Sequence, residues 1–290
     1  MVGDIADSRL ETIIMKLLNI VFAAAFLFTT AVRAQDSLSA QTRKVFAERQ
    51  DSVIWISVVA KVSMQAEGAK EAVNIPDREQ KAETLGTILD SSGFIVTALS
   101  SIDPTRELSG REVRTRDGTV KIEASATLKE VRITMPDGTE IPADVLMRDT
   151  DLDLAFLRIK AGSKESKGVE FKAVDLKDAA TANVGDDVVS ISRMDEVLNR
   201  VGSVSRGQVM SITRKPREFM RVTGASLGCP TFSMDGKLVG IAVSRFVRGK
   251  PSHNVVIPAA DVLEIALQAR EAKPLAEEKP KRTEDKKDEK

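Results

Sequence analysis

The segment Gly224-Ala-Ser-Leu-Gly-Cys-Pro-Thr-Phe-Ser-Met-Asp-Gly-Lys-Leu-Val-Gly-Ile241 decides the fold of this chain, and it lies within a series of short predicted strands. Glycine, proline and aspartate residues separate these strands, and such residues favour tight turns. Many short strands with turns of this kind are typical of an antiparallel barrel or sandwich. The strands are predicted at Asp187–Ile191, Val204–Ile212, Phe219–Val222, Lys237–Ser244 and Asn254–Ile257.

A second series of predicted strands precedes this one along the chain. Leu85–Asp90 and Phe94–Thr97 flank Ser91-Ser92-Gly93, which predicts two strands joined by a tight turn. Residues 64–83 are polar and residues 103–130 are weakly patterned, so we expect two long surface insertions there. The remaining strands are predicted at Val53–Val62, Val131–Met135, Ile141–Leu146 and Leu154–Ile159.

Five segments, in order along the chain, resemble motifs of the trypsin-like serine proteases of the HtrA/Deg type. Gly93–Ile102 is similar to the segment that carries the catalytic histidine of that family, and Asp149–Ile159 to the segment that carries its aspartate. Gly224–Ile241 is similar to the nucleophile motif G-N-S-G-G-P and the strand after it. The resemblance implies an all-β fold of two six-stranded-type antiparallel β-barrels with a short C-terminal helix, and we expect no PDZ domain. The two other similar segments are Val184–Ile191 and Val204–Ser211.

The resemblance places the three catalytic positions on Ser100, Asp153 and Leu227. Only the aspartate is retained, because a hydroxyl cannot replace an imidazole as general base and leucine has no nucleophilic atom. Ala225, Ser226 and Leu227 occupy the oxyanion-loop positions, where the Cβ of Ala225 replaces a glycine. We therefore expect a site that does not cut peptides, in which Asp153 hydrogen-bonds Ser100 or nearby backbone.

Two alternatives retain a nucleophile. One residue inserted before Pro230 would place Ser226 at the nucleophile position, still without a base. Cys229 could instead pair with His253, although the simpler interpretation makes Cys229 a small buried residue and His253 a loop residue. The family layout places His253 in the specificity-pocket region. That region comprises Val243, Ser244 and His253.

Composition excludes several classes of function. Lys and Arg total 43, as do Asp and Glu, and this zero net charge disfavours a nucleic-acid binder. The chain has one cysteine and one histidine, so it can form neither an internal disulfide nor a zinc site of the Cys/His type. We expect no metal and no cofactor.

The N-terminal region resembles an export signal. Met15 and Lys16 precede the apolar run LLNIVFAAAFLFTTAV, which is followed by Arg33-Ala34. This pattern predicts a signal peptide cleaved near Ala34, a true start at Met15, and a mature protein in the periplasm or outside the cell, with no membrane span. The alternative is an uncleaved membrane anchor.

The expected organisation follows the chain from end to end. Its segments are an extension and signal peptide at 1–34, a helical segment at 35–52, the first barrel at 53–160, a linker at 161–182, the second barrel at 183–258, an amphipathic helix at 259–272 and a disordered charged tail at 273–290.

Three functions are compatible with this sequence. The first is a pseudoprotease that binds unfolded or extended polypeptides by strand addition, or that regulates an active protease relative. The second is a weak or unusual hydrolase that uses Ser226 or Cys229. The third is a purely structural exported domain. The resemblance also implies a homo-oligomer as one arrangement.

Overall fold

The structure is a computed structural model that describes residues 37–67, 75–109, 111–115, 118–247 and 250–275. The predicted signal peptide and most of the charged tail lie outside these residues. The chain forms two units, Met1–Lys44 and Val45–Lys290, and both barrels belong to the second. Residues 37–49 are helical, where the sequence predicts a polar helix, and η1 (Gln50–Ser52) follows.

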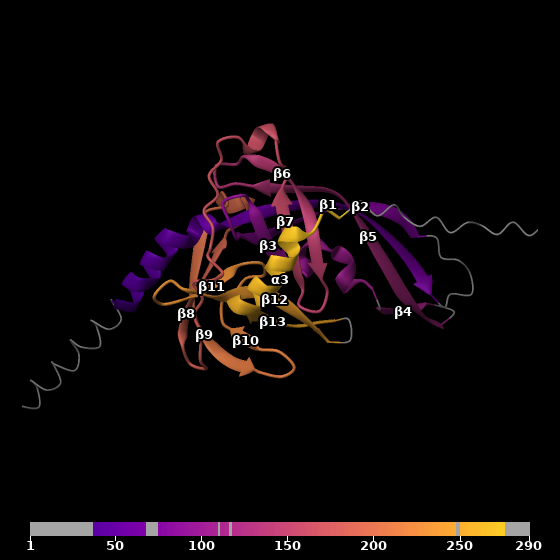
Figure 1. The fold of residues 1–290 in the computed structure, drawn as a ribbon. Coiled ribbons are helices and arrows are strands. Elements are labelled where there is room, and N and C mark those ends of the chain that lie inside the picture. The colour runs from indigo at the N-terminus through magenta and orange to yellow at the C-terminus, as the bar shows by residue number, and fades with distance from the viewer. Residues whose placement is uncertain (1–36, 68–74, 110, 116–117, 248–249, 276–290) are drawn as a thin grey trace, which may run out of the picture. The chain divides into compact units, whose positions relative to one another are not determined.

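The first barrel is built from an antiparallel sheet. Its strands are β1 (Val53–Glu67), β2 (Ile75–Ile88), β3 (Phe94–Ala98), β4 (Glu112–Thr115), β5 (Gly118–Thr134), β6 (Glu140–Asp149) and β7 (Leu154–Ile159). They follow the order β1-β2-β3-β7-β6-β5-β4, and an additional pairing between β1 and β5 closes six of them into a ring (Figure 1). Two short helices, α2 (Leu99–Ile102) and η2 (Pro104–Glu107), follow β3.

The second barrel is closed by six antiparallel strands in the order β10-β13-β12-β11-β8-β9. Their bounds are β8 (Asp187–Arg193), β9 (Gly202–Thr213), β10 (Phe219–Val222), β11 (Pro230–Ser233), β12 (Leu238–Val247) and β13 (Lys250–Pro258). Along the chain, η3 (Lys164–Ser166) belongs to the connection between the two barrels, and η4 (Glu196–Leu198) lies between β8 and β9. The structure therefore has the double β-barrel that the sequence predicts.

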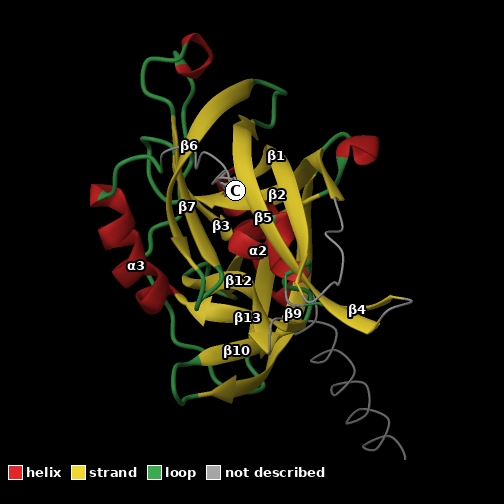
Figure 2. Ribbon diagram, turned by 90° about the vertical axis from the view of Figure 1, so that its right-hand side faces the viewer, coloured by secondary structure: helices red, strands yellow, loops and turns green. Residues whose placement is uncertain are grey.

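The C-terminal helix α3 (Ala259–Glu271) lies beside the second barrel (Figure 2). Its apolar residues recur at helical spacing, so one face is buried while the other remains polar. That face packs on β12, β13 and β6 and joins an apolar cluster with members from both barrels. The helix thus contacts strands of both barrels. In the described part of the chain no helix is long and apolar enough to cross a membrane. The buried face of α3 comprises Ala259, Val262, Ile265, Ala266 and Ala269.

The prediction of long surface loops at residues 64–83 and 103–130 is wrong. Strands β1 and β2 extend into the region 64–83, and β4 and β5 occupy much of 103–130. Together they form a ribbon that reaches beyond the barrel, with β4 near its end (Figure 1). Its outer part carries charged side chains, with Lys61 2.6 Å from Asp77 across the β1–β2 pair. Only β2 has charged residues on both faces, which hides its strand pattern. The outer parts of β1 and β5 do alternate apolar with polar residues, as at Val62 and Met64 and at Val120 and Ile122, so that signal was present and was missed.

Candidate functional site

Asp153, the retained aspartate of the site, lies at the end of a tight turn between β6 and β7. Asp149 Oδ1 accepts hydrogen bonds from the amides of Asp151 (3.0 Å) and Leu152 (2.8 Å), which fixes the turn. Asp153 then has a φ of 58°, a left-handed conformation that aspartate tolerates better than most residues. The Asp153 carbonyl accepts from the amide of Leu99 at 2.8 Å, so this turn is attached directly to α2.

The Asp153 carboxylate is almost completely buried, since only 1% of the residue's surface is exposed. It accepts hydrogen bonds from the Ser100 amide (2.8 Å), the Ser100 hydroxyl (2.8 Å) and the Ser244 amide (2.9 Å). The hydrogen bond expected between Ser100 and Asp153 is therefore present. Ser100 comes from the first barrel and Ser244 from the second, so this one carboxylate links the two barrels.

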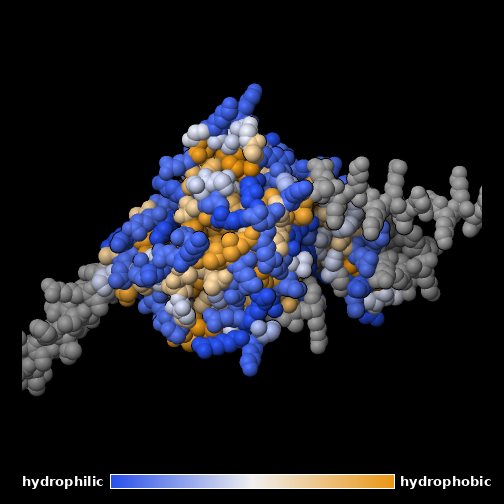
Figure 3. All heavy atoms as spheres, viewed as in Figure 1, coloured by the Kyte–Doolittle hydropathy of each residue, from blue (hydrophilic) through white to orange (hydrophobic). Residues whose placement is uncertain are grey.

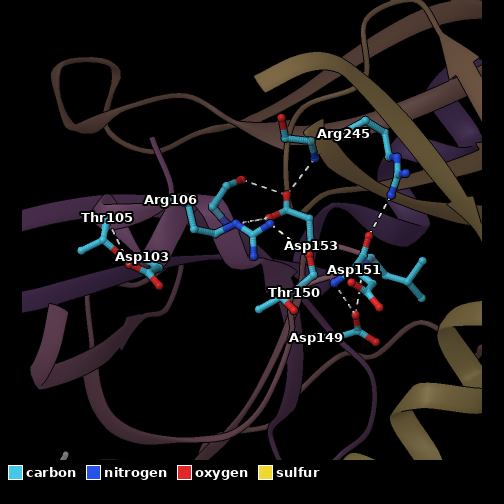
Figure 4. A network of polar contacts seen from close by, with 11 residues as sticks. Asp103, Thr105, Arg106, Asp149, Thr150, Asp151, Asp153 and Arg245 are labelled. Carbon is cyan, nitrogen blue, oxygen red and sulfur yellow. Dashed lines mark hydrogen bonds and ion pairs between the residues drawn. The ribbon is translucent and has the colours of Figure 1, made fainter. Parts of the chain in front are cut away.

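Arg106 is a site residue that the sequence analysis did not identify. Its Nε lies 3.6 Å from Asp153 Oδ1, and its Nη2 donates to the Thr150 carbonyl at 3.0 Å (Figure 4). The guanidinium also lies 4.6 Å from the centre of the Phe246 ring. Arg106 belongs to η2, within the region interpreted as an insertion. No local signal in that region identified it, because its partners are distant in sequence.

Burial sets the protonation behaviour of Asp153. The loss of water around the carboxylate raises the pKa of Asp153 above its ordinary value of 3.8. Hydrogen bonds from Ser244 and Ser100, and the charge of Arg106, act in the opposite direction without cancelling the effect of burial. The surrounding donors therefore compensate only part of the desolvation of this charge.

This raised pKa predicts a pH-dependent stability difference between the wild-type protein and Asp153→Asn. A carboxyl group with a higher pKa when folded binds its proton more tightly in the folded state. Its contribution to the free energy of unfolding is complete below about pH 3.8 and is lost as the pH rises through the raised pKa. Urea unfolding across a pH series should show wild-type stability minus Asn-variant stability falling with pH. A difference that rises with pH would show that the pKa of Asp153 is lowered instead.

The loop at the nucleophile position is attached to β12. The Gly228 amide donates to the Ala242 carbonyl at 2.8 Å, and the Cys229 amide donates to the Ser226 carbonyl at 3.1 Å. Ser244, which binds Asp153, is only two residues beyond Ala242 on the same strand. The structure thus brings the loop and Asp153 to one short stretch of β12.

The side chains of this loop provide little for acyl transfer. Ala225, Ser226 and Leu227 are half-buried. Leu227 has no nucleophilic atom. Ser226 has a hydroxyl, but the only histidine in the sequence that could act as its general base is His253. His253 is exposed and pairs with Arg245, at the far end of β12 from the loop.

The structure does not bring Cys229 and His253 together. The Cys229 carbonyl accepts from Ala242, while His253 pairs with Arg245, three residues further along β12 and therefore about 10 Å away. Cys229 is 1% exposed, and burial raises the pKa of its thiol far above the ordinary value. A buried thiol that resists ionisation is a poor nucleophile.

The three predicted specificity-pocket residues have different environments. Val243 is fully buried and belongs to the apolar cluster, so it contributes packing. Ser244 is buried and donates to Asp153, whereas His253 is exposed on β13. No group of three or more potential metal ligands occurs among the described residues.

Two hollows occur on the first barrel, away from these positions. One, of about 780 Å³, lies between β5 and β6, and the other, of about 510 Å³, lies beside the turn at Pro136. Neither is lined by Ser100, Asp153 or Leu227. The Asp153 carboxylate is buried and lines neither of these two hollows.

Comparison with known proteins connects this arrangement to one family. The family model of the trypsin-like peptidase domain matches residues 84–241, more than half of the chain. A probable periplasmic serine endoprotease DegP-like from Bartonella henselae is 29% identical over 147 residues, which are 47% of this chain and 27% of that relative. The chain thus matches only about a quarter of the length of that curated relative.

A solved structure of the MamO protease domain from Magnetospirillum magneticum, in the apo form, is 18% identical, with a TM-score of 0.44. The similarity covers 76% of this chain and 98% of that one. The family match extends from Thr84 in β2 to Ile241 in β12, so it includes the positions of Ser100, Asp153 and Leu227. The chain belongs to the family of trypsin-like peptidase domains.

Proposed function

We propose that this chain is an exported trypsin-like domain that binds extended polypeptide and does not cut it. The observation that carries the proposal is the hydrogen bonding of Asp153, whose carboxylate is engaged by Ser100 where the family mechanism needs an imidazole. Leu227 at the nucleophile position supports the same conclusion. Loss of one member of such a triad lowers turnover by about 10⁴-fold or more, and two are replaced here.

An unpaired strand edge supports peptide binding. Strand β11 pairs with β12 only from Leu238 to Ile241, and β13 pairs with the opposite edge of β12 from Gly240 to Val247. Apart from β13, no strand of the described chain pairs with β12 between Val243 and Phe246, where the Ser244 amide alone is occupied, by Asp153. An open edge of this kind can accept an extended peptide through main-chain hydrogen bonds.

Export is part of the proposal. The apolar run after Met15 and Lys16 has the pattern of a signal peptide, and the name of the Bartonella relative describes that protein as periplasmic. Both observations support a mature protein beginning near Gln35, outside the cytoplasm. Determination of the N-terminal residue of the protein after expression in a Gram-negative host tests this part directly.

The function is tested by incubating residues 35–290 with casein, an unfolded substrate, beside Ser226→Ala and Cys229→Ala. All three proteins should leave casein intact, because neither side chain has a base. Size-exclusion chromatography of the same mixtures should show intact casein eluting with the protein. Cleavage that disappears in one variant would identify a nucleophile and overturn the claim of inactivity. Failure of casein to elute with the protein would overturn the claim of binding.

A further inference from the structure

Positive charge is concentrated in one part of a chain that has no net charge. Residues 202–254 contain nine Lys and Arg side chains and two acidic ones, Glu218 and Asp235, for a net charge of +7. The rest of the chain therefore carries the compensating −7. A local excess of this size in a neutral chain indicates a charged partner rather than a requirement for solubility.

The β9–β10 hairpin presents four of these cations to solvent. Arg214, Lys215 and Arg217 lie at its tip and Arg221 lies on β10, and all four are exposed. None of them forms an ion pair within the described part of the chain. Hydrophilic side chains project from this lower end of the second barrel in Figure 3. The charges are therefore available to a partner.

The hairpin is connected to the open edge of β12. Arg245, on β12, lies 4.3 Å from the centre of the Phe219 ring at the start of β10, and its Nη1 donates to the Asp151 carbonyl at 2.7 Å. One residue further along β12, the Phe246 ring lies under the guanidinium of Arg106. Figure 4 shows these two arginines on either side of Asp153. A polypeptide paired with this edge would thus lie between the basic hairpin and the guanidinium groups of Arg106 and Arg245, which aromatic rings keep in place.

The chemistry of the surface favours an acidic polypeptide over other polyanions. The hairpin exposes two large apolar side chains, Val204 and Met210 on β9, but none lies between residues 211 and 246. The basic tip and the β12 edge therefore lack the apolar anchors with which proteins insert into lipid. The chain has no tyrosine, Phe219 is buried, and Phe246 lies under Arg106, which leaves no aromatic face for stacking on nucleic-acid bases.

We infer that the β9–β10 hairpin and the Arg245–Phe246 edge of β12 form a docking surface for extended segments rich in Asp and Glu. This inference rests on the proposed function and defines the class of polypeptide that the edge accepts. Main-chain pairing with β12 supplies affinity that is independent of sequence, and the cations supply the preference. Guanidinium groups already held against aromatic rings lose little freedom when a carboxylate binds.

The test measures fluorescence anisotropy of three labelled peptides of equal length, in which alternate residues are Glu, Gln or Lys and the others are Ala and Ser. The hairpin variant is Arg214→Glu/Lys215→Glu/Arg217→Glu. The control is Lys164→Glu/Lys167→Glu/Lys177→Glu, which makes the same charge change at three exposed lysines of the inter-barrel connection. The segment η3, which contains Lys164, lies at the opposite end of the molecule from the hairpin in Figures 1 and 2.

The Glu peptide should bind the wild-type protein and the control at least tenfold more tightly than the Gln peptide at low salt, because close opposite charges speed association. The hairpin variant should lose about tenfold in affinity for the Glu peptide and little for the Gln peptide. The preference should fade near 1 M salt, where the screening length is about 3 Å.

Each other outcome has a defined meaning. Equal binding of the Glu and Gln peptides, or equal losses in the hairpin and control variants, would overturn the inference and leave the proposed function standing. Absence of binding to all three peptides would overturn both. Binding to phosphatidylglycerol vesicles without binding to the Glu peptide would assign the cations to a lipid surface and overturn the inference.

Discussion

Replacement of Asp153 by alanine should lower the free energy of unfolding by about 3 kcal/mol at neutral pH, because it removes the acceptor of three hydrogen bonds in a buried site. The Ser100 amide and hydroxyl and the Ser244 amide would remain buried without this partner. Arg106 would also lose its neighbouring negative charge. The two barrels meet at this carboxylate, so the loss should appear as one cooperative shift of the urea transition.

Two further substitutions separate the loss of the hydrogen-bond acceptor from the effect of the left-handed backbone at this position. Asp153→Asn tolerates the φ of 58° and keeps one acceptor oxygen, but its NH2 group would face the amide of Ser100 or Ser244, so its loss of stability should be smaller than that of Asp153→Ala without vanishing. Asp153→Gly removes the carboxylate but relieves the left-handed backbone, so it should be less destabilising than Asp153→Ala. An alanine variant as stable as the wild-type protein would show that the carboxylate does not hold the barrels together.

Replacement of Gly228 by alanine should lower the free energy of unfolding by about 4 kcal/mol, because it combines left-handed strain with a steric clash. Gly228 has a φ of 74°, and a Cβ there would overlap the Leu85 carbonyl oxygen and lie 2.8 Å from Thr97 Oγ1. Both groups belong to the first barrel, while Gly228 itself bonds to β12 of the second. The clash would therefore force the barrels apart.

Gly138→Ala is the matched control for this substitution. Gly138 has a φ of 86°, yet a Cβ there would meet nothing within 4 Å. Gly138→Ala should lower the free energy of unfolding by about 1 kcal/mol, because only the left-handed backbone strain applies there. Thermal or urea unfolding of both variants measures the difference. Equal losses would show that the backbone at Gly228 moves enough to accommodate a methyl group.

The predictability of the fold differed between the barrels and the ribbon. Strands such as β3 and β7 have continuous apolar runs, because both faces are buried between other elements. In the ribbon only β2 has charged residues on both faces, whereas the outer parts of β1 and β5 alternate apolar with polar residues. The ribbon was therefore missed at β2 because its local pattern is absent, and at β1 and β5 although a strand pattern is present.

The sequence by itself determined the family, the double barrel and the residues at the three catalytic positions, because motif order and residue identity are local properties of the chain. It also predicted the pairing of Asp153 with Ser100, since a buried carboxylate needs donors. Only the tertiary structure decided that Arg106 accompanies Asp153, that Cys229 is buried, and that His253 lies far from it. Those facts depend on segments that are distant in sequence, whose approach is set by the closure of each barrel and the packing between them.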